Sequence, residues 1–139
     1  VWQSTHVGGD RFAGNVVMLP QGLYYGRVEP GDVQQLLEAH ALGRIAMDHY
    51  RGRAAHSFPV QAAEHAIRAS EGLAGIDDLE LVGVDAVDDG WRVRFRTRDA
   101  VVLEADVVSE LSEEPVFLTC GAAEPQRARH YFATALRRL

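Results

Sequence analysis

A histidine and an aspartate stand four positions apart around two glycines near the start of the chain, in the order His6, Gly8, Gly9 and Asp10. Imidazole nitrogens and carboxylate oxygens can both bind metal ions, and both groups can exchange protons. Two successive glycines allow the backbone to turn tightly and to approach a bound group closely. The pattern therefore indicates either a loop that binds a metal or cofactor, or a turn closed by hydrogen bonds between the two side chains.

The residues that follow this loop predict a β-hairpin and then a helix. Residues 15–19 and 23–28 are short apolar runs separated by a Pro-Gln-Gly turn, which is typical of an antiparallel hairpin. Pro30 favours a helix start, because proline suits the first helical turn. The apolar spacing over residues 33–41 fits a helix, which Gly43 can end.

The second half predicts a helix followed by antiparallel strands. A loop is expected at residues 51–59, and residues 60–71 have the apolar stripe of an amphipathic helix. The strand candidates are residues 79–84, 91–98, 101–108 and 116–120, while residues 126–139 fit either a helix or a strand. We therefore expect an α+β protein with two parts, residues 1–53 and residues 54–139, the second being a helix plus antiparallel β subdomain.

The charge pattern argues against nucleic acid as the main partner. The 139 residues carry a formal net charge of −6, whereas phosphate contacts need a basic face. All 14 basic residues are arginine, which indicates a GC-rich genome, and we expect a bacterial protein of the cytoplasm. Arg92, Arg94, Arg96 and Arg98 alternate along one predicted strand and so share a face, which is either a solvated surface or a patch for an anionic partner.

No sequence motif assigns an enzymatic or membrane role. No apolar run approaches the roughly 20 residues of a membrane-spanning helix. The single cysteine, Cys120, excludes an internal disulfide and is predicted to be a small buried hydrophobe. Paired cysteines, His-Glu-x-x-His, P-loop and Gly-x-Ser-x-Gly motifs are absent from the sequence, so no zinc site and no catalytic residue is predicted.

The segment STHVGGDRFAGN at residues 4–15 resembles a sequence block of the sucraseferredoxin family, and the resemblance continues through LYYGRV, YRGR, PVQAAE and LTCGA. It implies a thioredoxin-like fold, here the β-hairpin plus helix of the C-terminal half of a ferredoxin domain. It also implies a [2Fe–2S] cluster held by two upstream cysteines and a His-x-x-x-His loop. His6 falls on the first histidine position and Asp10 on the second, with Gly8 and Gly9 in the cofactor-binding loop between them.

The resemblance implies that the chain is the C-terminal portion of a [2Fe–2S] electron-transfer protein and supplies the histidine side of the cluster site. Because such a cluster needs four ligands, this chain alone is expected to bind none. The expected partners are an upstream cysteine-bearing segment or chain and a redox protein of unknown identity. Asp10 could bind iron, but we favour a carboxylate that orients His6 and caps the turn.

Two other functions remain open at this point. The first is a cluster-free binding or assembly domain that keeps the fold. The second is an enzyme in which His6 acts as a general base oriented by Asp10. A protein that carries electrons, or that only binds, fits the sequence better than one that converts a substrate.

Overall fold

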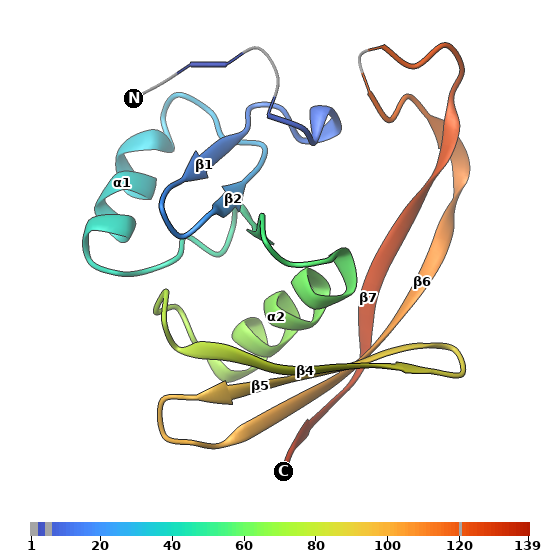
Figure 1. Cartoon of the computed structure of the whole chain (residues 1–139). Coiled ribbons are helices and arrows are strands. Elements are labelled where there is room, and N and C mark those ends of the chain that lie inside the picture. Colours follow the sequence, from blue (N-terminus) through green and yellow to red (C-terminus); the bar gives the residue numbers. More distant parts are fainter. Residues whose placement is uncertain (1–2, 5–6, 120) are drawn as a thin grey trace.

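The computed structural model describes residues 3–4, 7–119 and 121–139, and these residues form a mixed α+β protein with two antiparallel sheets (Figure 1). In chain order the elements are the 3-10 helix η1 (Asp10–Phe12), β1 (Val16–Met18), β2 (Leu23–Tyr25), α1 (Val33–Ala41), β3 (Tyr50–Arg53), α2 (Phe58–Glu71), β4 (Leu79–Val87), β5 (Gly90–Thr97), β6 (Val102–Val116) and β7 (Gln126–Arg138). No helix in the described ranges is long and apolar enough to cross a membrane. The predicted α+β class is confirmed.

The smaller sheet has the order β1-β2-β3 and packs against α1. The predicted hairpin is confirmed, since β1 and β2 pair antiparallel with Val17 opposite Tyr24, and α1 follows as expected. The predicted loop at residues 51–59 is wrong in its first part, because β3 pairs with β2. Arg-Gly-Arg lacks the apolar alternation of a strand, yet Gly52 is needed there, because a Cβ atom at this position would lie 2.5 Å from Cγ of Gln61 on α2.

The larger sheet has the order β4-β5-β6-β7 and packs one face on α2 (Figure 1). The fully buried side chains alternate along the strands, as the pleat requires. They come from α2, β4, β5 and β6, and comprise Val60, Ala63, Ile67, Leu79, Val93, Phe95, Leu103, Ala105 and Val107. The strands predicted at residues 79–84, 91–98 and 101–108 are therefore present, and the ambiguous C-terminal segment is strand β7.

β6 and β7 extend beyond the rest of the sheet as a two-stranded ribbon (Figure 1). β5 pairs with β6 only as far as Val107, whereas β6 and β7 stay paired to Val116 and Gln126. The predicted separate strand at 116–120 is therefore wrong. The register of β6 against β7 shifts between Leu111 and Pro115, and this irregularity accommodates the proline, so that β6 continues to Val116. Cys120 lies outside the described residues.

The arginines of β5 face away from α2 and are neutralised within the sheet. Nε of Arg92 donates a 2.7 Å hydrogen bond to Asp106, and Nε of Arg94 donates one of 3.2 Å to Glu104. Arg137 of β7 contacts the same two carboxylates at 2.6 and 3.1 Å. The arginine strand is thus a surface ion-pair network rather than a patch that lacks negative charge.

A buried ionic cluster on α2 connects the two cores. The carboxylate of Glu64 and the guanidinium of Arg68 are each about 1% exposed, and Nε of Arg68 lies 3.0 Å from Oε1 of Glu64. Arg53 and His56 lie 3.6 and 3.3 Å from the same carboxylate. Ile76, which follows α2 in the chain, packs into the core between the smaller sheet and α1. The division of the chain at residue 53 stays a prediction.

This cluster predicts that protein stability depends on Glu64 in mild acid. Burial raises the pKa of Glu64, but the hydrogen bond from His56 and the charges of Arg68 and Arg53 outweigh it and hold the pKa below its usual value. A carboxyl group whose pKa is lower when folded stabilises the protein above its unfolded pKa, about 4.3. That stabilisation is lost as the pH falls through the folded pKa.

We therefore expect the urea midpoints of the wild type and Glu64→Gln to differ most at pH 6–7 and to converge towards pH 3. Taking the difference removes the contribution of Asp106, whose pKa is also lowered by hydrogen bonds from Arg92 and Arg137. A difference that stayed constant between pH 7 and pH 3 would show that the charge of Glu64 contributes nothing.

Candidate functional site

The glycine loop is pinned to β2 by side-chain hydrogen bonds. Nδ2 of Asn15 donates to the carbonyl oxygens of Gly8 and Gly9 at 2.9 and 3.0 Å. The Tyr24 hydroxyl donates to the carbonyls of Val7, at 3.0 Å, and of Gly8. Gly8 and Gly9 have φ angles of +82° and +68°, a conformation that favours glycine. The double glycine therefore shapes a fixed loop, as its sequence indicates.

The structure describes only part of the two residues predicted as ligands in this loop, His6 and Asp10. The backbone of Asp10 begins η1. The Asp10 side chain and all of His6 lie outside the part of the chain that the structure describes, so their assignment as metal or cofactor ligands stays a prediction. The assignment of Gly8 and Gly9 to a cofactor-binding loop likewise stays a prediction.

Three arginines converge on a single phenylalanine ring beside this loop. The guanidinium carbons of Arg11, Arg51 and Arg27 lie 4.8, 5.1 and 5.8 Å from the ring centroid of Phe12. Arg11 and Phe12 come from η1, Arg27 follows β2, and Arg51 lies on β3. We call these three residues the arginine cluster.

The fold brings the arginine cluster together through backbone contacts. The amide of Arg27 donates a 2.6 Å hydrogen bond to the carbonyl of Phe12, which attaches η1 to the end of β2. Arg27 adopts a positive φ of 58°, which is uncommon for a residue with a side chain. The pairing of β2 with β3 then places Arg51 beside the other two arginines. Residues distant in sequence thus surround one ring.

The arginine cluster has no acidic partner among the side chains that the structure describes. None of its members forms an ion pair with a side chain that the structure describes, whereas Arg92, Arg94 and Arg137 each contact a carboxylate. Nε of Arg51 is buried without a hydrogen-bond partner in the described chain. Burial and then the charge of Arg27 lower the pKa of Arg51. The cluster is therefore a concentration of positive charge that the described side chains leave unneutralised.

Gly26 holds the space in which Phe12 and Arg51 meet. A Cβ atom at this position would lie 2.8 Å from Cβ of Phe12 and 3.2 Å from Nε of Arg51. We expect Gly26→Ala to lower the free energy of unfolding by about 1–3 kcal/mol, because overpacking forces η1 and β3 apart. Gly31→Ala is the matched control, since nothing lies within 4 Å of its added Cβ. Equal urea midpoints for both variants would contradict this packing.

The sequence pattern gives little sign of the arginine cluster. Only Arg11 lies in the glycine-rich segment, while Arg27 and Arg51 stand in the separate LYYGRV and YRGR segments. The one available signal is that each of the two lies next to a glycine, where a backbone can approach another closely. Strand β3, which sequence reasoning missed, was needed to bring Arg51 to the others.

The segment that carries the glycine loop and all three arginines is also the segment that known proteins share. Residues 1–52 match the sucrase/ferredoxin-like family. The expected resemblance to this family is thereby confirmed for residues 1–52, but the match does not support placing the chain in the C-terminal portion of such a protein. No solved structure matches the chain.

A related protein, "Altered inheritance of mitochondria protein 32" of the fungus Meyerozyma guilliermondii, is 48% identical over 54 residues. The aligned segment is 36% of this chain and 19% of that protein, so the chain spans under a fifth of the length of its relative. A fungal relative gives no support to the expected bacterial origin. The cytoplasmic location stays a prediction.

The prediction of a [2Fe–2S] electron-transfer function is wrong. Beyond the sucrase/ferredoxin-like description of residues 1–52, neither the family nor the fungal relative is described as an electron carrier. The described residues contain no group of three or more His, Cys, Asp or Glu side chains that could hold a metal ion. The expected cluster in a longer protein and the expected upstream cysteine-bearing partner are untested, and neither enters the function proposed below.

Proposed function

We propose that the family-matching segment binds a phosphate group, free or carried by a small ligand, at the arginine cluster. The observation that carries this proposal is the convergence of Arg11, Arg27 and Arg51 on Phe12 without a carboxylate among the described side chains. Three cations held together repel one another, and an anion between them removes that repulsion. A phosphate, with up to two negative charges and several acceptor oxygens, suits three guanidinium donors.

The Phe12 ring explains how the guanidinium groups can be held and still bind a ligand. A cation over a ring face gains roughly 0.5–1 kcal/mol at exposed sites. A guanidinium that stacks on a ring face keeps the N–H groups in its plane free to donate. Arg51 supports this most strongly, because its buried Nε has no acceptor within the described chain.

The proposal predicts that phosphate stabilises the folded protein. At constant ionic strength, replacing chloride with 20 mM phosphate is expected to raise the melting temperature by several degrees, because a ligand that binds only the native state stabilises it by mass action. Acetate at the same ionic strength is the control for a singly charged carboxylate and is expected to act more weakly. Equal melting temperatures in phosphate and chloride would remove the basis for the proposal.

We also propose that β1, β2 and α1 correspond to the hairpin and helix of a thioredoxin-like fold. The antiparallel register of β1 with β2 supports this, as does the position of α1 directly after the hairpin, with Leu36 buried in the same core. An experimental structure of a longer native chain tests this relation. A fold in which the hairpin did not continue a larger sheet would contradict it.

A further inference from the structure

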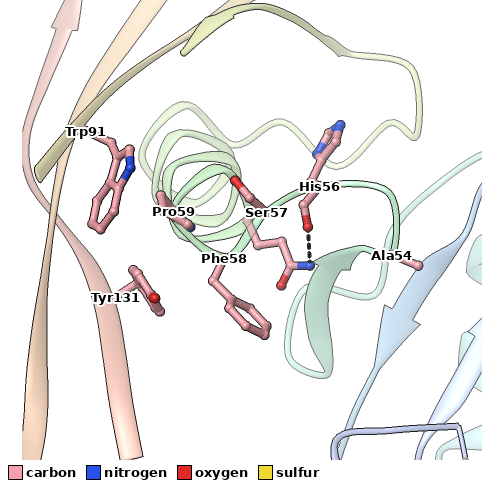
Figure 2. Close-up of a pocket in the computed structure, with 8 residues that line it drawn as sticks. Ala54, His56, Ser57, Phe58, Pro59, Trp91 and Tyr131 are labelled. Carbon is pink, nitrogen blue, oxygen red and sulfur yellow. Dashed lines mark hydrogen bonds between the residues drawn. The ribbon is translucent and has the colours of Figure 1, made fainter. Parts of the chain in front are cut away.

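A second candidate site lies on the other part of the chain, where the start of α2 meets the sheet. It is a cleft of about 540 Å³, within the range of small-ligand sites. Figure 2 shows side chains from the segment before α2, from the first turns of α2 and from β5 and β7 around it. The lining residues are Ala54, His56, Ser57, Phe58, Pro59, Gln61, Trp91 and Tyr131.

Three aromatic rings form one wall of this cleft. The rings of Phe58 and Tyr131 stack with centroids 5.8 Å apart and an interplanar angle of 29°. Trp91 tilts against Tyr131 at 5.6 Å. Phe58 is 67% exposed although it contacts Tyr131, so much of its ring is left to the solvent. An open wall of stacked rings offers a planar apolar group further stacking contacts.

Three polar side chains at the cleft can donate a hydrogen bond to a ligand. The hydroxyl of Ser57 makes no capping hydrogen bond at the start of α2. The indole N–H of Trp91 and the hydroxyl of Tyr131 have no acceptor among the residues that the structure describes. The two other polar side chains are already engaged, since Gln61 donates to two carbonyls and His56 contacts Glu64.

An arginine on β7 adds a positive charge beside these donors. Arg129 opposes Leu111 as Tyr131 opposes Ser109, so Arg129 and Tyr131 share the face of the ribbon that continues into the cleft. Nη1 of Arg129 donates 2.8 Å to the Ser109 hydroxyl, and Arg129 has no carboxylate partner in the described ranges. The cleft thus has an aromatic wall and hydrogen-bond donors, and an exposed arginine lies two residues from Tyr131 on the same face of β7. No acidic side chain is among the described residues that line the cleft.

We propose that this cleft binds a small planar aromatic anion, with its ring system against Phe58 and Tyr131 and its anionic group towards Arg129 and Ser57. A cationic ligand would be repelled by Arg129, and no carboxylate is among the described residues that line the cleft. A neutral hydrocarbon would leave the donors unpaired on desolvation. The site is separate from the arginine cluster, and the proposal stands on different residues.

The probe for this site is 2-naphthoate. Acetate is the control for the carboxylate without the rings, and 2-naphthalenemethanol is the control for the rings without the charge. The indole N–H resonance of Trp91, assigned with Trp91→Phe, is expected to shift and saturate with 2-naphthoate in the submillimolar to millimolar range. Acetate is expected to leave it unchanged, and the alcohol to bind about tenfold more weakly because it lacks the charge. Equal binding of the alcohol, or no shift with 2-naphthoate, would overturn the proposal.

Exposed residues on both sides of the cleft allow variants that fold. Phe58→Ser and Arg129→Gln are each expected to weaken 2-naphthoate binding about tenfold. Phe117→Ser is the control for an equally exposed ring, since Phe117 is 61% exposed and lies beyond the end of β6. Arg138→Gln is the control for an exposed arginine of β7.

Arg51→Met tests whether the two sites are separate. It is expected to leave 2-naphthoate binding unchanged, and a loss of binding would place the ligand at the arginine cluster instead. Weakening by Phe117→Ser or Arg138→Gln as large as that by the cleft variants would overturn the assignment, because the contact would then be unspecific.

Discussion

Replacing Arg68 with leucine is expected to lower the free energy of unfolding by about 3–5 kcal/mol, the range for a buried ion pair that loses one partner. The Arg68 side chain is fully buried, and its guanidinium forms the 3.0 Å contact with Glu64. It also donates to the carbonyls of Leu73, Gly75 and Ile76 at 3.2, 2.7 and 3.3 Å. The variant therefore leaves a buried carboxylate with weaker partners and three carbonyls without this donor.

Urea unfolding at pH 7 measures this effect, and two further variants identify its cause. Arg98→Leu is the control, because its ion pair with Asp78 is on the surface, with Arg98 66% exposed, and is expected to change stability by under about 1 kcal/mol. The double variant Glu64→Leu/Arg68→Leu is expected to be more stable than Arg68→Leu alone, because it leaves no unpaired buried carboxylate. A double variant that is less stable than Arg68→Leu would show that lost packing, and not the unpaired charge, sets the cost.

Replacing Arg51 with methionine is expected to abolish most of the phosphate binding without destabilising the unliganded protein. Methionine keeps an unbranched apolar chain against Phe12 but removes the charge and the buried Nε. A charge-assisted hydrogen bond contributes about 1.5–3 kcal/mol, so binding should weaken roughly 10- to 100-fold. Burial and Arg27 lower the pKa of Arg51, which means that folding disfavours its charge, so removing that charge should not cost stability.

Melting temperatures with and without phosphate measure both effects in one series. In chloride, Arg51→Met is expected to melt at the wild-type temperature or above it. In phosphate, the wild type is expected to gain stability and the variant is not. Arg44→Met, at an exposed position away from Phe12, is the matched control and should respond to phosphate like the wild type. A phosphate response that survives Arg51→Met would move the anion to another surface.

The local elements of this protein could be predicted because their signals are local. The Pro-Gln-Gly turn between two apolar runs is sufficient to indicate the β1–β2 hairpin, and the apolar stripe of α2 indicates which face is buried. The errors concern pairings between distant segments. β3 contains Gly52 between two arginines and is a strand only because β2 lies beside it. β6 continues past Pro115 only because a register shift against β7 accommodates the proline.

The candidate site was harder to predict for the same reason. The resemblance of residues 4–15 led to the correct family but directed attention to ligand residues, of which His6 lies outside the described chain and Asp10 is described in its backbone alone. The arginine cluster depends on three contacts that composition does not reveal, namely the hydrogen bond between η1 and Arg27, the close approach at Gly26 and the pairing of β3. By contrast, the alternating arginines of β5 are easy to see in the sequence, but neighbouring carboxylates neutralise them.

The most direct test of the arginine cluster is a titration of the ¹⁵N-labelled protein with inorganic phosphate, observed at the arginine Nε–H resonances. Assignment uses Arg11→Lys, Arg27→Lys and Arg51→Lys, and ionic strength is held constant with chloride. We predict that the Nε–H signals of Arg11, Arg27 and Arg51 shift together along one saturating curve, while those of Arg92 and Arg94 stay in place. Unchanged signals from the arginine cluster, or equal shifts at every exposed arginine, would contradict a phosphate site around Phe12.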